Sequence, residues 1–403
     1  MTPFPASWPA VRPRIIVRGP ESMVDAVFTM AALQALRQAL PEQTLALLAP
    51  EPQAALWRGH PAVDHLWLRT ARDTTSSLVR QWQAEGFDVA LVASDSWQAA
   101  WEAWRAGTPM RVGFARGWWR GFLTHAVKPR PAALERPMSV RQVRRAVAGL
   151  ATAVEGSGRP PEAGGAEHAG EAWFRLVAAM GLPVRPQPPR IALTDSEVRR
   201  AVERLGLPDP AADSVPWVVL DVRSGAAPAA RWPEDRWRQA VGRIHKTRPC
   251  RWLLTGGMRD RDFSRPLAVR LARELASWRQ GGSAPGAVAS EQWVFHLAGK
   301  ATLREWLAVA SRCAVVVAVH PASLHLAAAA GARTLGLAAA LDPGAWKPGA
   351  PDDPRHRMLV SPTPCVACRR AQCPLDRRCL EGVTADQIAG ALAAMLAQPK
   401  GRG

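Results

Sequence analysis

A repeated alternation between short apolar runs and helical stretches is the feature that most restricts the fold of this 403-residue chain. Runs of strand length lie at 14–17 (RIIV), 44–49 (TLALLA), 87–94 (FDVALVAS) and 111–114 (RVGF), and residues 25–40 have apolar side chains at helical spacing. Strands that alternate with helices in this way are typical of parallel β-α-β units. The first half of the chain is therefore predicted to form a parallel sheet.

The second half of the chain restarts the same alternation. Its apolar runs lie at 217–222 (WVVLDV), 251–257 (RWLLTGG), 314–319 (AVVVAV) and 334–339 (TLGLAA). AVVVAV is continuously apolar, as expected for a strand buried on both faces of a sheet. Two such series predict two doubly wound α/β domains, and in this architecture ligands bind at the carboxyl ends of the parallel strands.

The predicted domain boundaries follow from this alternation. We expect a first domain over 1–205 and a second over 206–383, which ends in a cysteine-rich tail. Residues 384–403 are predicted to form a terminal helix and tail, with the option that this helix packs back on the first domain. The stretch 156–170 has few apolar residues and is predicted to be a flexible insertion.

Composition favours a globular protein without a membrane span. Hydrophobic residues make up 48% and charged residues 21% of the chain, and no uninterrupted apolar stretch reaches the roughly 18 residues needed to cross a bilayer. Residues 324–341 come nearest, but they include His325 and Arg333 and are predicted to be a helix followed by a strand. The N-terminal segment has no apolar region typical of a secretory signal, so we expect a cytoplasmic protein.

The formal net charge of +18 indicates an anionic partner. Nucleic acid, an acidic lipid surface and a phosphorylated substrate all have the required charge. Compositional bias is an alternative explanation, because the excess is mostly arginine in an alanine- and proline-rich chain. The basic residues are scattered and form no nucleic-acid-binding motif, so nucleic acid is the least favoured partner.

Four cysteines cluster near the C-terminus with the spacing C-x2-C-x4-C-x5-C: Cys365, Cys368, Cys373 and Cys379. In a cytoplasmic protein such a cluster indicates either a metal or free thiols before it indicates disulfides. Four converging thiolates would hold a structural zinc or iron ion in tetrahedral geometry. Free thiols are the alternative.

Several segments, in order along the chain, resemble glycosyltransferase family 9, the lipopolysaccharide heptosyltransferases. They include ESMVDAVFTMAALQAL (21–36), GTPMRVGFARGWWRGFLTHAV (107–127), RWPEDRW (231–237) and SLHLAAAAG (323–331). The resemblance implies a GT-B fold, in which two Rossmann-like domains face each other across a cleft. It also implies that the first domain binds a sugar acceptor and the second a nucleotide-sugar donor, usually ADP-heptose.

The activity that the resemblance implies is an inverting glycosyl transfer that requires no metal or other cofactor for the chemistry. The expected acceptor is the anionic inner core of lipopolysaccharide, so we expect the protein at the cytoplasmic face of the inner membrane. A retargeted or non-catalytic member of the family is the alternative. Such a protein would be a sugar- or lipid-binding scaffold, or a transferase with another donor or a protein acceptor.

Asp25 matches the aspartate that acts as general base in the family. A base is needed because the acceptor hydroxyl must lose its proton as it attacks the anomeric carbon. The alternative is that Asp25 is an ordinary N-cap of the helix that follows the first strand. Ser22 and Met23 belong to the same segment and are predicted to lie on the acceptor side.

The loop after the strand at 217–222 resembles the diphosphate-binding segment of the family. Ser224, Gly225 and Ala226 follow the strand, and Arg231 precedes a helix. The family has a lysine where this chain has Ala230, so Arg231 is predicted to contact the diphosphate with its forked guanidinium group. The alternative for Arg231 is a solvated surface charge.

His320, Pro321 and Ala322 replace the Asp-Ser-Gly of the family at the end of the strand at 314–319. His320 is predicted to contact the donor there, because an imidazole can hydrogen-bond a hydroxyl group or, when protonated, a phosphate. Ser323 and His325 follow and are predicted to lie on the donor side, and His325 also matches the family. The alternative for His325 is a helix histidine packed against the core.

Lys300, Thr302 and Asp342 complete the donor-side prediction. Lys300 and Thr302 match a loop that faces the nucleotide in the family, and Asp342 matches an aspartate before a proline. The pattern from Thr302 to Glu305 is also that of a helix capping box, and both interpretations can hold together.

The loop ARGWWRGF places Arg116, Trp118, Trp119 and Arg120 together. The resemblance puts this loop on the acceptor side. Arginine beside exposed tryptophan suits an anionic amphipathic acceptor or a membrane interface. The alternative is that both tryptophans belong to the core.

Overall fold

The computed structural model describes residues 12–130, 136–153, 167–212, 214–223, 231–280, 293–350 and 352–398. It contains two compact units: the first comprises 1–131 and 167–192, and the second comprises 132–166 and 193–403. Most of the insertion predicted at 156–170 lies outside the described residues, as do Ser224, Gly225 and Ala226.

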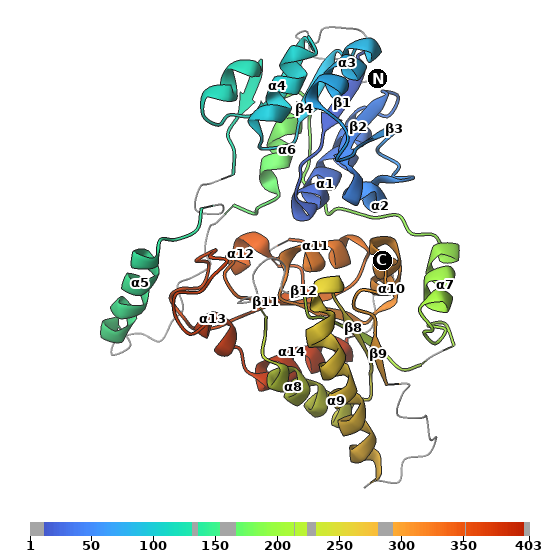
Figure 1. Ribbon diagram of the computed structural model, residues 1–403, viewed down its shortest axis with the longest axis vertical. Coiled ribbons are helices and arrows are strands. Elements are labelled where there is room, and N and C mark those ends of the chain that lie inside the picture. The colour runs from blue at the N-terminus through green and yellow to red at the C-terminus, as the bar shows by residue number, and fades with distance from the viewer. Residues whose placement is uncertain are drawn as a thin grey trace. The chain divides into compact units, whose positions relative to one another are not determined.

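The first unit holds six strands and the helices that connect them (Figure 1). In chain order its elements are β1 (Ile15–Arg18), α1 (Met23–Ala39), β2 (Leu45–Pro50), η1 (Glu51–Gln53), α2 (Ala54–Trp57), β3 (His65–Arg69), α3 (Thr75–Glu85), β4 (Val89–Val92), α4 (Trp97–Arg105), β5 (Met110–Phe114), η2 (Trp118–Phe122), β6 (His125–Val127) and α6 (Glu171–Ala178).

The sheet of the first unit is parallel and has the strand order β3-β2-β1-β4-β5-β6. Ile16, Ala90 and Val92 pack against Trp82 of α3 and Ala99 of α4, so these two helices cover one face of the sheet. The order reverses between β1 and β4, because the chain builds outward from β1 on one side and then returns to its other side. A reversal of this kind opens a crevice at the carboxyl ends of the two strands.

The second unit has the same plan (Figure 1). Its elements are α5 (Val140–Ala153), α7 (Asp195–Arg204), β7 (Trp217–Asp221), α8 (Glu234–Thr247), β8 (Arg251–Thr255), η5 (Met258–Asp260), α9 (Arg261–Gln280), β9 (Val294–His296), α10 (Leu303–Arg312), β10 (Val315–Ala318), α11 (Pro321–Ala329), β11 (Thr334–Ala338), α12 (Pro343–Trp346), β12 (His356–Val360), α13 (Arg378–Glu381) and α14 (Ala385–Ala397).

The second sheet is also parallel, with the order β12-β11-β10-β7-β8-β9, so its reversal lies between β7 and β10. One face carries the core of the unit, in which Val218, Trp252 and Val317 pack against Trp237 of α8 and Leu392 of α14. Helix α14 thus packs within the second unit. The predicted fold class, two doubly wound parallel α/β domains, is confirmed.

The predicted strands agree with the structure to within a residue or two at most ends. The segment 324–341 is indeed a helix followed by a strand, α11 and β11. Pro233 is the N-cap of α8, with an extended ψ of 142°, although proline is more often found at the first helical position. In the part of the chain that the structure describes, no helix combines the length and apolarity needed to cross a membrane.

Candidate functional site

The loop after β1 presents Asp25 at the reversal point of the first sheet. Ser22 is the N-cap of α1, and its Oγ accepts a hydrogen bond from the backbone N–H of Asp25 at 3.1 Å. The alternative that Asp25 is itself the N-cap is therefore wrong, because Ser22 satisfies the free N–H group. Asp25 lies in the first turn instead, where the helix dipole stabilises its negative charge.

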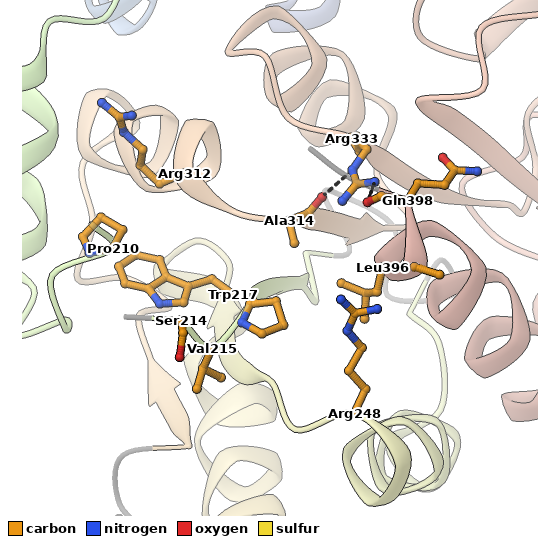
Figure 2. Close-up of a pocket in the computed structure, with 12 residues that line it drawn as sticks. Pro210, Ser214, Val215, Trp217, Arg248, Arg312, Ala314, Arg333, Leu396 and Gln398 are labelled. Atoms are coloured by element: carbon orange, nitrogen blue, oxygen red, sulfur yellow. Dashed lines mark hydrogen bonds between the residues drawn. The ribbon is translucent and has the colours of Figure 1, made fainter. Parts of the chain in front are cut away.

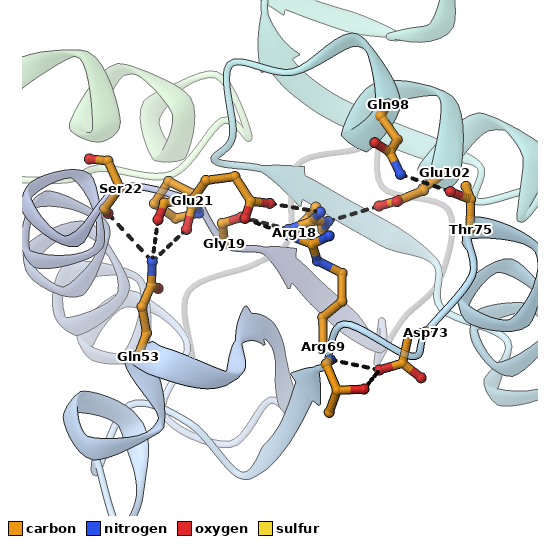
Figure 3. A network of polar contacts seen from close by, with 12 residues as sticks. Arg18, Gly19, Glu21, Ser22, Gln53, Arg69, Asp73, Thr75, Gln98 and Glu102 are labelled. Carbon is orange, nitrogen blue, oxygen red and sulfur yellow. Dashed lines mark hydrogen bonds and ion pairs between the residues drawn. The ribbon is translucent and has the colours of Figure 1, made fainter. Parts of the chain in front are cut away.

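A network of polar contacts holds the loop between β1 and α1 in place (Figure 3). The buried Arg18 donates from Nε to Glu102 Oε2 at 2.8 Å, and its Nη1 donates to the carbonyl of Gly19 at 2.9 Å. From the other side, Gln53 Nε2 donates to the carbonyl oxygens of Pro20 at 2.8 Å and Glu21 at 3.1 Å. Side chains from three elements therefore fix the backbone that carries Ser22 and Asp25.

Arg130 is the partner of the Asp25 carboxylate. Its Nη2 lies 2.7 Å from Asp25 Oδ1, and the Arg130 side chain is only 9% exposed. The guanidinium carbon lies 4.6 Å from the centre of the Trp173 ring, which adds a cation–π contact. Among the described residues no donor reaches Asp25 Oδ2, so one carboxylate oxygen is left for another ligand.

A second carboxylate, Asp95, lies in the loop after β4 and is paired with Arg116, whose Nε lies 2.5 Å from Asp95 Oδ2. Burial raises the pKa of Asp95, Arg116 and Arg130 oppose this shift, and Asp25 adds to it. Because Arg116, Arg130 and Asp25 all influence this pKa, the four charged groups lie near one another. They follow four adjacent strands, β1, β4, β5 and β6, and so form one charged cluster at the carboxyl edge of the sheet.

The other residues predicted on the acceptor side lie around this cluster or on the surface. Met23 begins α1 and is half-buried. Trp118 is 69% exposed, which excludes the core alternative for this residue. Trp119 is half-buried beneath Gly117, and Arg120 is exposed.

In the second unit a further group of charged side chains gathers at the carboxyl edge of the sheet. Arg231 Nη2 lies 3.0 Å from Asp260 Oδ1, and the guanidinium also stacks over the ring of Phe263 at 4.5 Å. Arg231 is therefore a half-buried, ion-paired residue and not a solvated surface charge. Asp260 also accepts a hydrogen bond from the backbone N–H of Gly257 at 2.9 Å, which fixes the loop after β8.

His320 lies at the reversal point of the second sheet, between the ends of β10 and β7. Burial lowers its pKa, Arg223 lowers it further, and Asp221 and Asp260 oppose the shift. The imidazole is therefore neutral at pH 7 and suits a hydroxyl partner better than a phosphate. The buried His320 Nδ1 has no hydrogen-bond partner among the described residues.

The first turn of α11 follows His320 and carries a second unsatisfied group. His320 is the N-cap without a side-chain capping bond, and Pro321 occupies the first helical position. Ser323 is fully buried, and its Oγ has no partner among the residues that the structure describes. Unsatisfied buried polar atoms are costly, and at a helix N-terminus they lie where anionic and hydroxyl-bearing ligands bind.

Capping roles account for two of the remaining donor-side predictions. Thr302 forms a capping box with Glu305 at the start of α10, as its spacing predicts. Asp342 caps the short helix α12 by accepting from the backbone N–H groups of Gly344 and Ala345. His325 is buried at 3% exposure, and the backbone N–H of Lys300 bonds to the carbonyl oxygen of Leu297.

The four clustered cysteines are free thiols in this structure. Cys365 and Cys368 pack against Val143 of α5 in a small apolar cluster. Burial raises the pKa of Cys379 to about 12, and the neighbouring thiols add to the shift. Within the described ranges, no group of three or more His, Cys, Asp or Glu side chains is arranged to hold a metal ion, so the structure does not support the zinc or iron site that the cysteine spacing suggested.

A cavity of about 360 Å³ lies at the opposite, amino edge of the second sheet (Figure 2). Its lining includes Trp217, Ala314, Arg333 and Leu396. Arg333 donates to the carbonyl oxygens of Met395 and Gln398 at the end of α14 and to that of Ala314. This arginine therefore caps a helix C-terminus, where a positive charge is favoured, and the cavity is remote from the strand ends that carry His320.

Sequence reasoning missed several residues of both clusters. The missed residues lie in segments whose side chains meet only after folding. They are Arg130 and Asp95 in the first unit, and Asp221, Arg223 and Asp260 in the second. The available signal was their position: each lies within a few residues of the carboxyl end of a strand.

The two units together have the architecture of a GT-B-like, two-domain α/β protein. Residues 75–378 match the family model described as glycosyltransferase family 9 (heptosyltransferase). The match spans more than half of the chain, so this protein belongs to glycosyltransferase family 9. A comparison with curated protein sequences gives no match.

Solved structures similar to this chain include the Escherichia coli ADP-heptose lps heptosyltransferase II, with 16% identity, a TM-score of 0.66 and coverage of 95% of this chain and 98% of that one. The E. coli heptosyltransferase WaaC with ADP has 18% identity, a TM-score of 0.63 and coverage of 95% and 99%. A family 9 glycosyltransferase from Veillonella parvula has 15% identity, a TM-score of 0.66 and coverage of 96% and 97%. At these identities the likeness establishes the fold.

Proposed function

We propose that this protein is an inverting glycosyltransferase that transfers heptose from ADP-heptose to the inner core of lipopolysaccharide. Membership of glycosyltransferase family 9 supports a transferase. The observation that carries the proposal is the pair of polar clusters at the strand-reversal points, one in each unit, because this is where α/β folds bind ligands.

Asp25 is the general base in this proposal. Its Oδ2 takes the proton of the acceptor hydroxyl while the hydroxyl oxygen attacks the anomeric carbon, and the bond to the nucleoside diphosphate breaks in the same step. Arg130 holds the carboxylate through Oδ1 and so orients the oxygen that reacts. The Ser22 cap and the Arg18 network keep the backbone of this base in place.

Arg116 and Arg130 are suited to an acceptor that carries carboxylate or phosphate groups. Arg116 pairs with Asp95, and Arg130 pairs with Asp25. A guanidinium has five N–H donors, so it can hold that carboxylate and an anionic ligand together. Residues at the start of α1 and in η2 complete the proposed acceptor side: Ser22, Met23, Trp118, Trp119 and Arg120.

The second unit is proposed to bind the donor. The leaving diphosphate needs positive charge, which Arg231, Arg223 and the N-terminus of α11 supply without a metal in the chemical step. His320 Nδ1 and Ser323 Oγ provide polar atoms for the sugar or diphosphate. The match to the family assigns seven further residues to the donor-binding side: Ser224, Gly225, Ala226, Lys300, Thr302, His325 and Asp342.

A transferase with a different nucleotide sugar is the second candidate. His320, Pro321 and Ala322 stand where the family has Asp-Ser-Gly, and a neutral imidazole cannot replace a permanent carboxylate. This change favours an altered contact with the donor sugar. The same acid–base chemistry at Asp25 would serve either donor.

The acceptor chemistry also implies a cellular location. A lipid-anchored lipopolysaccharide precursor is presented at the cytoplasmic face of the inner membrane, so the protein is proposed to act there as a peripheral protein. Its positive net charge would attract an anionic membrane surface.

Thermal unfolding in the presence of nucleotides tests the donor assignment. A ligand that binds only the folded state must raise the melting temperature. We expect ADP and ADP-heptose to raise it and UDP, GDP and CMP to leave it unchanged. Stabilisation by UDP or GDP in place of ADP would favour the second candidate, and no stabilisation by any nucleotide would contradict both.

A further inference from the structure

We propose that a tryptophan-rich surface on α4 and η2 docks this protein onto an anionic lipid bilayer. Among the described residues, five large hydrophobic side chains are exposed, and three of them lie on these two elements: Trp97 at 50%, Trp104 at 46% and Trp118 at 69%. The other two, Met258 and Val269, belong to the second unit. Exposed tryptophans gathered on one surface mark an interaction site.

The three exposed indole rings and the half-buried ring of Phe122 form a continuous strip. The ring of Trp97 lies 6.0 Å from that of Trp118, Trp118 lies 5.7 Å from Phe122, and Phe122 lies 5.2 Å from Trp104. The strip therefore crosses from one end of α4 to the other by way of η2. We call Trp97, Trp104, Trp118 and Phe122 the aromatic strip.

The charge around the aromatic strip is positive. Arg105 ends α4 and Arg120 lies in η2; both are exposed, and neither pairs with an acidic side chain in the described part of the chain. The acidic group of α4, Glu102, points inward and is neutralised by the buried Arg18 at 2.8 Å. The surface thus carries uncompensated guanidinium groups beside exposed indoles.

This combination fits the interfacial layer of an anionic bilayer. Indole rings prefer the headgroup level, because one part of the ring is apolar and its N–H group bonds to water or lipid oxygens. Basic residues near the surface are attracted by acidic headgroups. A neutral protein partner would satisfy the tryptophans but would leave the arginines without a counterion, so the charge favours the bilayer.

The inference rests on the proposed function for its biological setting, since an enzyme acting on a lipid-anchored acceptor gains by being held at the membrane. Its physical test is independent of catalysis. It uses the full-length protein and sedimentation with two kinds of vesicle: pure phosphatidylcholine, and an equimolar mixture of phosphatidylglycerol and phosphatidylcholine.

We expect the wild-type protein to bind the anionic vesicles and not the neutral ones, with binding that weakens as salt is added. The double variant Trp97→Ser/Trp104→Ser should lose at least tenfold in partition onto anionic vesicles, because it removes half of the aromatic strip. Arg105→Gln should weaken binding roughly fivefold, the effect of losing one basic residue near the surface. Met258→Ser/Val269→Ser is the matched control and should bind like the wild type.

Turnover of a lipid-free, water-soluble acceptor fragment separates this inference from the proposed function. The Trp97 and Trp104 substitutions should leave that turnover unchanged, because neither residue lies in the proposed site. Equal binding of the wild type and the double variant to anionic vesicles would overturn the inference. Equal binding of the wild type to neutral and anionic vesicles would also overturn it. Self-association that the double variant abolishes, without vesicle binding, would assign the strip to a second copy of the chain and would also overturn it.

Discussion

Arg130 Nη2 lies 2.7 Å from Asp25 Oδ1, although 105 residues separate the two positions in the chain. The contact forms because β1 and β6 belong to the same sheet and both release their loops at its carboxyl edge. Arg175 of α6 steadies the approach to Arg130 by donating to the carbonyl oxygens of Lys128 and Pro129. A carboxylate held at one oxygen by a largely buried guanidinium is well oriented for proton transfer at the other.

Replacing Arg130 by methionine should weaken binding of an anionic acceptor. A hydrogen bond to a charged group is worth about 1.5–3 kcal/mol, so KM for the acceptor should rise roughly tenfold to a hundredfold. The matched control is Arg80→Met, which removes an exposed arginine from α3 of the same unit. Steady-state kinetics with varied acceptor would show the difference, and an unchanged KM would remove Arg130 from the acceptor site.

Ser323→Ala should separate donor binding from stability. The Ser323 hydroxyl is buried without a partner among the described residues, so its removal should leave the melting temperature unchanged or raise it slightly. The stabilisation by ADP should fall severalfold if the hydroxyl bonds the donor. Ser277→Ala, an exposed position on α9, should alter neither quantity. A large loss of stability in Ser323→Ala would contradict the structural part of this prediction.

Arg333→Met should destabilise the second unit. The side chain is 9% exposed, and its substitution removes three hydrogen bonds to carbonyl oxygens: a buried one to Met395 and partly buried ones to Ala314 and Gln398. We expect a loss of about 2–4 kcal/mol in the free energy of unfolding, measured by urea denaturation. Arg248 lines the same cavity (Figure 2) but is exposed. Arg248→Met should therefore change the free energy of unfolding by less than about 0.5 kcal/mol. Equal effects of the two substitutions would refute the capping role.

The stability of the second unit should decrease in mildly acidic solution. Burial lowers the pKa of His356 from 6.5 to about 4, and Thr334 Oγ1 lies 3.0 Å from its Nδ1. The unfolded chain therefore takes up a proton below pH 6.5 that the folded chain does not take up until about pH 4. The contribution of the neutral His356 to the free energy of unfolding is therefore fully present above pH 6.5. This contribution is lost as the pH falls from 6.5 to about 4.

The variant His356→Gln isolates this contribution. Its unfolding free energy should vary less with pH between 6.5 and 4 than that of the wild type, when both are measured by urea denaturation at several pH values. The absolute stability of the variant is not the readout, because the substitution also changes packing. Parallel curves for the two proteins would show that His356 does not titrate as described.

The interior strands were predictable because they are apolar on both faces. RIIV and AVVVAV became β1 and β10 within one residue, and each is buried along its whole length. Three strands that sequence reasoning did not delimit, β3, β6 and β12, lie at the ends of the two sheets and are partly exposed. Edge strands carry fewer apolar residues, so their pattern is weaker.

The site was predictable in position and not in its pairings. Asp25 and His320 follow buried strands, and the apolar periodicity alone locates them at the carboxyl edges. The partners Arg130 and Asp260 were missed because an ion pair between distant loops depends on tertiary packing, which no local pattern records. The sequence is also compatible with Asp25 as an N-cap, whereas in the structure Ser22, three residues earlier, has that role.

The most direct test of the proposed mechanism is the rate of transfer from ADP-heptose to a heptose-deficient lipopolysaccharide core acceptor, compared between the wild type and Asp25→Asn. We expect the wild type to form the glycosylated product and ADP, and Asp25→Asn to lower kcat by about 10²–10⁴-fold while ADP still stabilises the folded protein. Wild-type turnover by Asp25→Asn would contradict the account, because the asparagine side chain cannot accept the proton of the acceptor hydroxyl.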